Sequence, residues 1–287
     1  MTGGRRYIPR VSHSHPAHRH PRYTELPPSA ALSSWIECYW SIQAADTPTI
    51  PNRVLPDGCS DLIVGISNDP TPMVVGTMRT AAVIPTAGRV DLFGIRFHPG
   101  AALAFLGAPI GELTDRRIPL EQLWGRGADA MAAALEPARH ADRAARAERL
   151  LQRRLAAWAR NRQGDEAMVT RAVNLLRRAR GGVGVGQVAA ALGVGQRRLQ
   201  RAFDRSVGLG PKALGRVLRF RRALRDLYRR GNADGAPGWA SLAFDAGYAD
   251  QSHFIREFRA LAGLTPARYL AERRRVGFVQ YEGDGTG

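Results

Sequence analysis

Two short stretches of the chain carry side chains of the kinds that form paired hydrogen bonds with planar partners. Arginine, glutamine and asparagine can each make two hydrogen bonds with the edge of a purine base, and isoleucine can touch the methyl group of thymine. The chemistry suggested is therefore recognition through contact, without bond making. The candidate base-reading residues are Arg197, Gln200 and Arg201 in the first stretch and Gln251, Ser252 and Arg256 in the second.

An internal repeat places these two stretches at equivalent positions. Each copy is predicted to be a short helix, a tight turn at a glycine (Gly193 or Gly247), and a longer helix closed by Gly-Leu-x-Pro. A residue that leaves a helix often needs positive φ, which glycine adopts at least cost. This order of elements is the helix-turn-helix form. The residues that match at an interval of 55 are Leu199, Arg201, Phe203, Gly208, Leu209 and Pro211 with Phe254, Arg256, Phe258, Gly263, Leu264 and Pro266.

The apolar residues of each longer helix predict which face is buried. Leu199 and Phe203 are four apart, as are Phe254 and Phe258, so each pair forms a stripe on one side of its helix. Asp250 stands where an N-cap belongs in the second copy. On a single exposed helix, arginine and glutamine are more often simply solvated. Two copies with arginine on the same face favour base reading.

Charge supports a polyanionic partner for this region. The chain has 42 Lys and Arg against 25 Asp and Glu, a net charge of +17. Residues 167–275 contain 22 basic and 7 acidic residues, whereas the first 166 contain 20 and 16. The excess is therefore local, as expected for a nucleic-acid-binding segment. Between the copies, residues 216–230 predict a rigid connecting helix whose arginines, such as Arg221, are expected to meet phosphates.

The first part of the chain has a different pattern. From residue 23 to 126, short apolar or alternating runs are interrupted by Gly and Pro, which predicts strands and turns, with a barrel as one arrangement. Arg96 and His98, with Asp57 and Asp61, form the polar group that suggests a pocket. The favoured interpretation is simpler, with Asp57 in a turn after Pro56 and Asp61 capping or solvated.

Several classes of protein are excluded or disfavoured. No run of roughly 18 apolar residues predicts a membrane span, and no secretory signal follows the first arginines, so we expect a cytoplasmic protein. Cys38 and Cys59 lack the spacing of a zinc site and are predicted to be reduced thiols. The N-terminal tail contains four histidines, His13, His15, His18 and His20. The prolines among them argue against a strand, so metal binding by these histidines is disfavoured.

Residues 167–275 resemble the C-terminal DNA-binding domain of the AraC/XylS family of bacterial transcription regulators. The second copy, AFDAGYADQSHFIREFRALAGLTPARY, carries the family signature almost throughout, and VAAALGVGQRRLQRAF carries a weaker version. Gly195 and Leu214 depart from the serine and the aromatic residue that are usual there. The resemblance implies an all-helical domain that places two recognition helices in successive major grooves. It also implies that a sensor region, often a cupin-like barrel, comes first.

The predicted fold class is α+β multidomain, with a mostly-β, cupin-like N-terminal domain followed by an all-α domain with two helix-turn-helix motifs. We expect a flexible tail at 1–22, a sensor or oligomerisation domain at 23–126, a helical linker at 127–166, the DNA-binding domain at 167–275 and a second flexible tail at 276–287.

The predicted function is sequence-specific regulation of transcription, controlled through the N-terminal domain, with no catalysis, metal or cofactor. The expected partners are double-stranded DNA, RNA polymerase, a small-molecule effector and a second copy of the chain, with no membrane. Two alternatives stay open. One is an enzyme or repair protein fused to a DNA-binding domain. The other is a non-specific nucleic-acid binder, which would lose affinity for all sequences together as salt rises.

Overall fold

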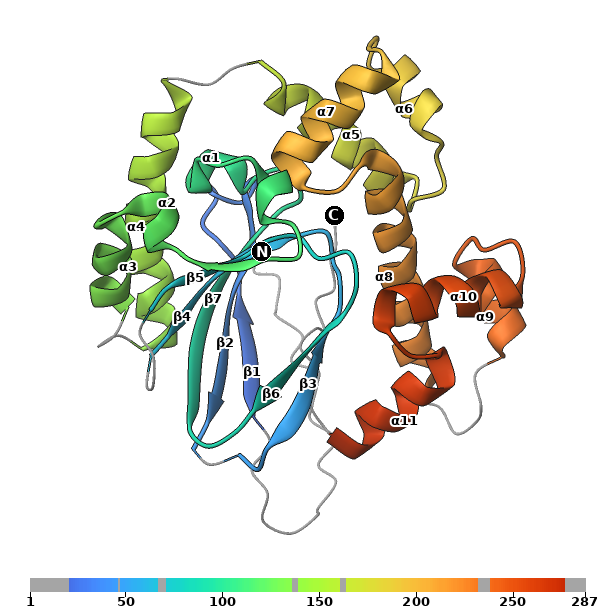
Figure 1. Cartoon of the computed structure of the whole chain (residues 1–287), viewed down its shortest axis with the longest axis horizontal. Helices are drawn as coiled ribbons and strands as arrows, with labels where there is room; N and C mark the ends of the chain where they lie inside the picture. Colours follow the sequence, from blue (N-terminus) through green and yellow to red (C-terminus); the bar gives the residue numbers. More distant parts are fainter. Residues whose placement is uncertain are drawn as a thin grey trace, which may run out of the picture.

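A computed structural model describes residues 21–45, 47–66, 71–135, 139–160, 164–231 and 238–276. A β-rich half is followed by a helical half, as the sequence predicted (Figure 1). The four tail histidines and residues 277–287 lie outside the described residues. The predicted tail limits are slightly wrong, because Arg22 already belongs to a strand and Val276 still belongs to a helix.

The β-rich half is built on a six-stranded antiparallel sheet in the order β1-β2-β7-β4-β5-β8, accompanied by a two-stranded sheet of β3 and β6. The hydrogen-bonded register pairs Trp40 with Gly94 and Asp61 with Arg96. The strands are β1 (Arg22–Leu26), β2 (Ile36–Ala44), β3 (Ile50–Val54), β4 (Ser60–Gly65), β5 (Met73–Val75), β6 (Ala82–Thr86), β7 (Val90–Phe97) and β8 (Arg117–Pro119).

Alternation along the strands gives the large sheet two different faces. Successive side chains of a strand point to opposite sides, so Leu62 and Val64 of β4 join the main core of this half, while Asp61 and Ile63 point the other way. On β2, Tyr39 belongs to that core and its neighbour Trp40 to a smaller cluster. One face is thus packed by helices, and the other borders a cavity.

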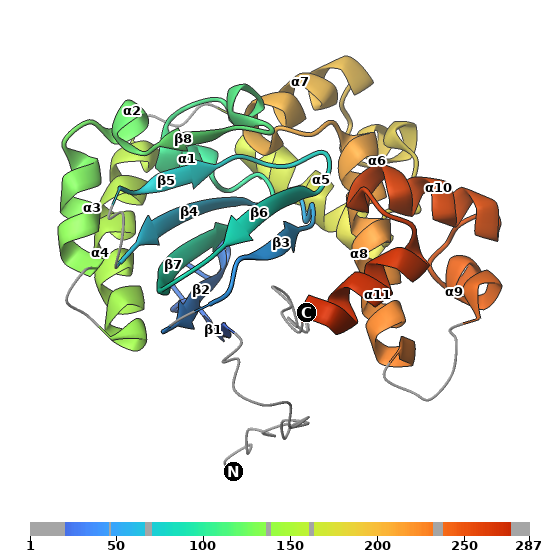
Figure 2. The ribbon, with the colours of Figure 1, turned by 60° about the horizontal axis from the view of Figure 1, so that its bottom comes forward.

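Helices cover the first face (Figure 2). They are α1 (Leu103–Leu106), a short 3-10 helix η1 (Ile110–Leu113), α2 (Glu121–Trp124), α3 (Gly127–Leu135) and α4 (His140–Ala159). Residues 127–166 were predicted to be a linker, yet Met131, Leu135 and Leu151 are fully buried in the core of the β-rich half. Arg143 of α4 also donates two hydrogen bonds to Asp91 at 2.9 and 3.1 Å. This helical pair is therefore part of the β-rich half.

The helical half shares one hydrophobic core. Helix α8 runs through it, and the two repeat copies pack around α8 (Figure 1). No helix in the described part of the chain is both long and apolar enough to cross a membrane. The helices are α5 (Glu166–Arg178), α6 (Val185–Ala191), α7 (Gln196–Val207), α8 (Pro211–Gly231), α9 (Trp239–Asp245), α10 (Gln251–Ala262) and α11 (Pro266–Val276).

The packing of Trp40 on the glycine opposite it generates a prediction. A β-carbon at Gly94 would lie 1.9 Å from Cε2 of Trp40, so Gly94→Ala must displace the ring. We expect the free energy of unfolding to fall by about 1 to 3 kcal/mol, because the core is overpacked. Gly127→Ala is the control, since its β-carbon would have an ordinary 3.5 Å contact. Urea unfolding measures both, and equal losses in the two variants would contradict this packing argument.

Candidate nucleic-acid interface and adjoining cavity

The first repeat copy consists of α6 and α7, joined by a turn at Gly193, whose φ is +66°. Helix α7 has no side-chain cap at Gly195, in agreement with the missing serine. Leu199 and Phe203 are fully buried, as their spacing predicted. The candidates on the opposite face, Arg197, Gln200 and Arg201, are all exposed.

The second copy, formed by α9 and α10, repeats this arrangement with a stronger cap. Oδ1 of Asp250 accepts a hydrogen bond from the backbone N–H of His253 at 2.7 Å, which confirms the predicted N-cap. Phe254 and Phe258 are fully buried. His253 packs its ring on Tyr248, with centroids 5.3 Å apart, so it has a structural contact of its own. Gln251, Ser252 and Arg256 are exposed on the outer face.

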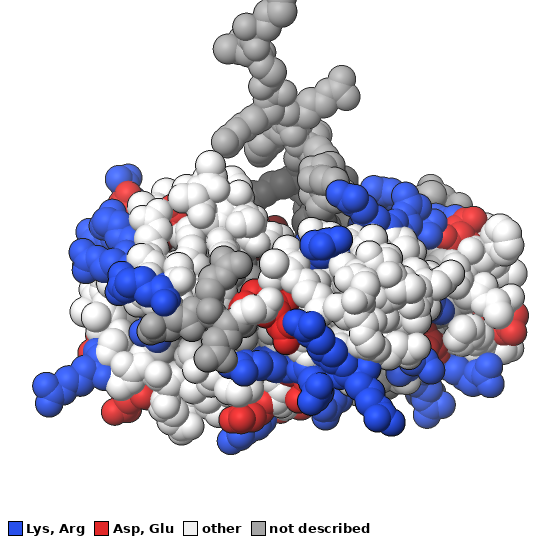
Figure 3. All heavy atoms as spheres, turned by 90° about the horizontal axis from the view of Figure 1, so that it is seen from above, with Lys and Arg blue, Asp and Glu red and all other residues white. Residues whose placement is uncertain are grey.

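The two copies therefore present equivalent exposed surfaces. Arg201 and Arg256 have no hydrogen bond or ion pair within the described part of the chain, so their guanidinium groups are available to an external partner. Basic side chains gather along the lower middle and right of the face seen in Figure 3, with a few acidic ones among them. We call α7 and α10 the recognition helices.

The connecting helix α8 differs from its sequence-based interpretation. Arg221, expected to meet phosphate, is largely buried and faces the β-rich half. Its guanidinium lies 3.7 Å from Oε1 of Glu37 and donates to the backbone oxygen of Asp57 at 3.4 Å. The apolar and basic pattern of residues 216–230 correctly predicted a helix, but it did not reveal that a second domain covers part of the basic rim.

Glu37 of β2 joins the β-rich half to two helices of the helical half. Its carboxylate lies 3.8 Å from Arg177 of α5, in addition to Arg221 of α8, and accepts a hydrogen bond from the Cys59 thiol at 3.0 Å. Burial alone would raise the pKa of Glu37, but the guanidinium groups of Arg221 and Arg96 outweigh burial and lower it to about 2. Sequence analysis missed this residue, because a lone glutamate in a strand carries no local signal.

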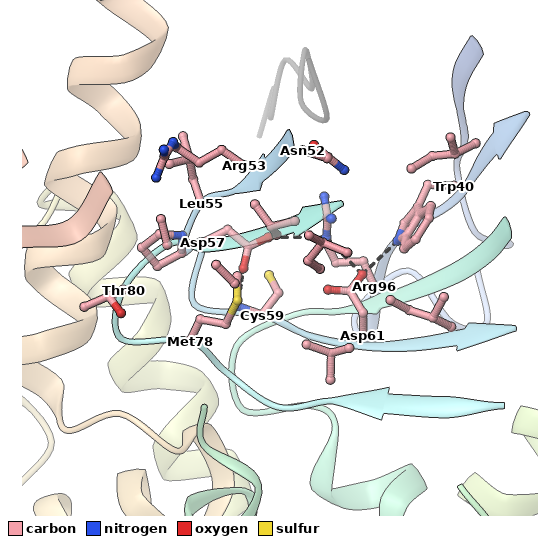
Figure 4. Close-up of a pocket in the computed structure, with 18 of the residues that line it drawn as sticks. Trp40, Asn52, Arg53, Leu55, Asp57, Cys59, Asp61, Met78, Thr80 and Arg96 are labelled. Atoms are coloured by element: carbon pink, nitrogen blue, oxygen red, sulfur yellow. Dashed lines mark hydrogen bonds and ion pairs between the residues drawn. The ribbon is translucent and has the colours of Figure 1, made fainter. Parts of the chain in front are cut away.

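Between the large sheet, the β3–β6 sheet and α8 lies a cavity of about 830 Å³. Figure 4 shows Trp40, Asp61 and Arg96 at one end and Arg53, Leu55 and Thr80 at the other. Most of its wall is apolar. The strands supply the apolar side chains of Trp40, Ile42, Ile63, Val75, Ile84, Val90 and Leu92. Helix α8 adds Arg221, Leu224, Arg225 and Tyr228.

The polar end of the cavity is a buried cluster. Nε of Arg96 lies 3.3 Å from Oδ2 of Asp57 and from Oδ1 of Asp61, close enough for ion pairs but misaligned for a hydrogen bond with either. Asp61 also accepts a hydrogen bond from Nε1 of Trp40 at 2.8 Å. Burial raises the pKa of Asp61 to about 6. The positive charge of Arg96 opposes this rise, and the negative charge of Asp57 adds to it. The favoured interpretation of Asp61 as a capping or solvated residue is therefore wrong.

The predicted turn at Asp57 is present, since Oδ1 accepts from the backbone N–H of Cys59 at 2.9 Å. His98 lies apart from the cavity, and its ring contacts the backbone oxygen of Ser33 at 3.2 Å.

Burial raises the pKa of both the Cys38 and the Cys59 thiol, which disfavours the reactive thiolate form. Within the described ranges, no three His, Cys, Asp or Glu side chains are grouped as metal ligands.

Comparison with protein families gives two matches. Residues 188–272 match the family described as "Helix-turn-helix domain", and residues 24–119 match "Domain of unknown function (DUF6597)". No curated protein matches.

Solved structures give weaker similarities. A protein of Rhodopseudomonas palustris described as a probable AraC family transcriptional regulator is 23% identical, with a TM-score of 0.32, and the match covers 37% of this chain and 95% of that one. The C-terminal domain of the response regulator AraT from Geobacillus stearothermophilus is 21% identical, with a TM-score of 0.32 and coverage of 42% and 93%. ToxT of Vibrio cholerae, bound to an unsaturated fatty acid, is 10% identical, with a TM-score of 0.41 and coverage of 80% and 93%.

The charge of Glu37 generates a pH-dependent prediction. Its pKa in the folded chain lies below that of an exposed glutamate, so its stabilising effect is complete above about pH 5 and lost as the pH falls toward 2. Replacing Glu37 by Gln should lower the free energy of unfolding at pH 7 by about 2 to 3 kcal/mol, because Arg177 and Arg221 lose their buried partner. The difference should shrink steadily in acid.

Asp142→Asn is the matched control for this charge removal. Asp142 pairs with Arg139 on the exposed surface, so its loss should cost less than about 0.5 kcal/mol. Denaturant unfolding of both variants between pH 7 and pH 3 makes the measurement. A Glu37→Gln deficit that stays constant with pH would contradict the assigned role of the carboxylate.

Proposed function

We propose that the chain is a DNA-binding transcription regulator of the AraC/XylS family, supported by the helix-turn-helix match over residues 188–272, and that its recognition helices read base sequence directly. The observation that carries this proposal is the equivalent exposure of Arg201 and Arg256, each opposite a fully buried stripe. Arginine reads guanine through two hydrogen bonds in the major groove. Arg197, Gln200, Gln251 and Ser252 are the further proposed contacts.

The length of the connecting helix supports readout of two grooves on one side of the DNA. Helix α8 has 21 residues and is therefore about 31 Å long at 1.5 Å per residue. Equivalent major grooves recur about every 34 Å along one face of the duplex. A helix of this length, with a recognition helix packed on each part of it, suits two sites about one helical turn apart.

The two arginines should each control a separate part of the DNA site. Replacing Arg201 or Arg256 by alanine should cost about 1 to 3 kcal/mol of binding free energy and relax sequence preference mainly at one base pair. The two affected positions should lie about ten base pairs apart. Sites selected from random DNA by the wild type and by each variant measure both quantities.

Arg153→Ala is the control, because Arg153 is exposed on α4, away from the recognition helices. It should select the same sites as the wild type. If Arg201→Ala and Arg256→Ala lose affinity uniformly across sequences, these arginines contact phosphate only, and the proposal of base reading fails. Loss of all site preference in moderate salt by the wild type itself would favour the non-specific alternative.

We also propose that the cavity beside α8 receives a small-molecule effector. Its volume of about 830 Å³ lies in the range of small-molecule pockets, and its wall is mostly apolar with a few polar groups. Seven arginines and three aspartates line it, so a ligand with an apolar body and a negatively charged group fits best. Since α8 belongs to the core of the DNA-binding helices, a ligand here would touch both halves of the chain.

A fluorescent probe of this chemistry tests the cavity without knowledge of the natural effector. Anilinonaphthalene sulfonate combines an apolar ring system with a sulfonate and should bind the wild type. Leu92→Trp adds volume to the wall and should weaken binding at least about fivefold. Leu150→Trp, on α4 and outside the cavity, should not. Fluorescence titration compares the three proteins, and equal affinity in all of them would contradict a ligand site here.

The remaining partners follow from the class of regulator. We propose that the DNA-bound chain works in the cytoplasm, contacts RNA polymerase and pairs with a second copy, with no catalytic step. The raised pKa values of Cys38 and Cys59 support the last point, because neither thiol is set up as a nucleophile. Sedimentation of the protein with and without its selected DNA site tests for the second copy.

A further inference from the structure

The two recognition helices end in the same way. Gly208 is the C-cap of α7, and Gly263, 55 residues later, is the C-cap of α10; both glycines have positive φ (+79° and +75°). The last carbonyl groups of any helix lack partners within the helix and need donors from elsewhere. In both copies, donors come from the β-rich half.

At the end of α7, two threonine hydroxyls supply these donors. Oγ1 of Thr77 donates to the backbone oxygen of Val207 at 2.7 Å, and Oγ1 of Thr114 donates to that of Gly208 at 2.9 Å. Both threonines are buried, at 1% and 8% exposure. Water therefore does not compete for these hydrogen bonds, so they fix the end of α7 firmly.

At the end of α10, the donors are a backbone amide and an arginine side chain. The N–H of Ala81 donates to the backbone oxygen of Leu261 at 2.7 Å, and Nη1 of Arg53 donates to that of Ala262 at 3.1 Å. Arg53 also holds Glu272 of α11 through two hydrogen bonds of 2.8 and 3.1 Å. Val207 and Ala262 are equivalent repeat positions, so the β-rich half holds both copies at the same point.

One short loop, residues 76–81 between β5 and β6, takes part in both contacts. Thr77 and Ala81 are only four residues apart along it. The loop has its own support, because Gly76 donates to the backbone oxygen of Arg116 at 3.0 Å and Thr77 accepts from the amide of Asp115 at 3.0 Å. A short loop held by its own hydrogen bonds is rigid, so it fixes the ends of α7 and α10 relative to the β-rich half.

We propose that Thr77, Thr114 and Arg53 are positioning residues that set the separation and relative rotation of the two recognition helices, and so the spacing between the two DNA half-sites that the protein accepts. This inference rests on the proposed base reading by α7 and α10. Adding one base pair moves a half-site by about 3.4 Å along the axis, and turns it because the duplex has about 10 base pairs per turn. Two recognition helices that are held rigidly relative to each other cannot adjust to both this shift along the axis and this rotation.

The same loop is part of the cavity wall. Gly76, Met78, Thr80 and Ala81 all line it, as does Arg53. A ligand in the cavity therefore touches the elements that hold both recognition helices.

Operators with altered spacing test the proposal on the full chain. The site selected by the wild type is rebuilt with one base pair inserted or removed between its halves, and affinity is measured for each. We expect the affinity of the wild type to fall at least about tenfold when one base pair is inserted or removed. For Thr77→Val and Arg53→Ala, the same changes in the operator should lower affinity no more than about threefold. Base preference within each half should stay as in the wild type.

Two further variants separate positioning from a general structural effect. Thr77→Ser keeps the donated hydroxyl and should retain the wild-type spacing penalty. Arg79→Ala changes the same loop, but among the described residues the exposed Arg79 side chain pairs only with Asp115, so this variant should also behave as wild type. Thermal melts monitored by circular dichroism check that each variant is folded.

The outcomes are distinct. A spacing penalty that persists in folded Thr77→Val and Arg53→Ala overturns the proposal, as does an equal loss of affinity at every spacing. If Arg201→Ala and Arg256→Ala leave base preference untouched, the proposed base reading fails instead. That result is obtained with the original operator and does not depend on the spacing series.

Discussion

A single helix, α8, has to satisfy two neighbours at once, and the rest of the structure depends on this constraint. One side of α8 provides Phe220 and Leu227 to the core shared by both repeat copies. Another side carries Arg221 to the buried carboxylate of Glu37 and borders the cavity. A buried arginine is costly without a partner, so the β-rich half cannot be moved away from α8 without exposing or replacing this contact.

Local patterns were sufficient to predict the helical half from sequence. The four-residue spacing of Leu199 with Phe203 and of Phe254 with Phe258 fixes which face is buried, and therefore which face is exposed. Asp250 was identified as a cap because a cap requires a particular side chain at one position. Such features depend on neighbours in the sequence, and they survive in the folded chain.

The contacts between segments far apart in the chain could not be predicted in the same way. Asp61 and Arg96 are 35 positions apart and meet only because β4 and β7 pair in register. Arg221 looked like a solvent-facing cation, since nothing near it in the sequence marks the strand that covers it. Residues 127–166 were predicted to be a helical linker, but which surface their helices cover depends on the sheet. In each case the missing information is the long-range pairing of segments.

The hydrogen bonds at the ends of α7 and α10 reach only main-chain oxygens. Every amino acid supplies the same carbonyl group, so these bonds make no demand on the side chains of the recognition helices. Exposed residues such as Arg201 and Gln251 can therefore be exchanged in evolution without any compensating change in the β-rich half. A lineage of such proteins can acquire new DNA targets while its way of holding the two helices stays the same.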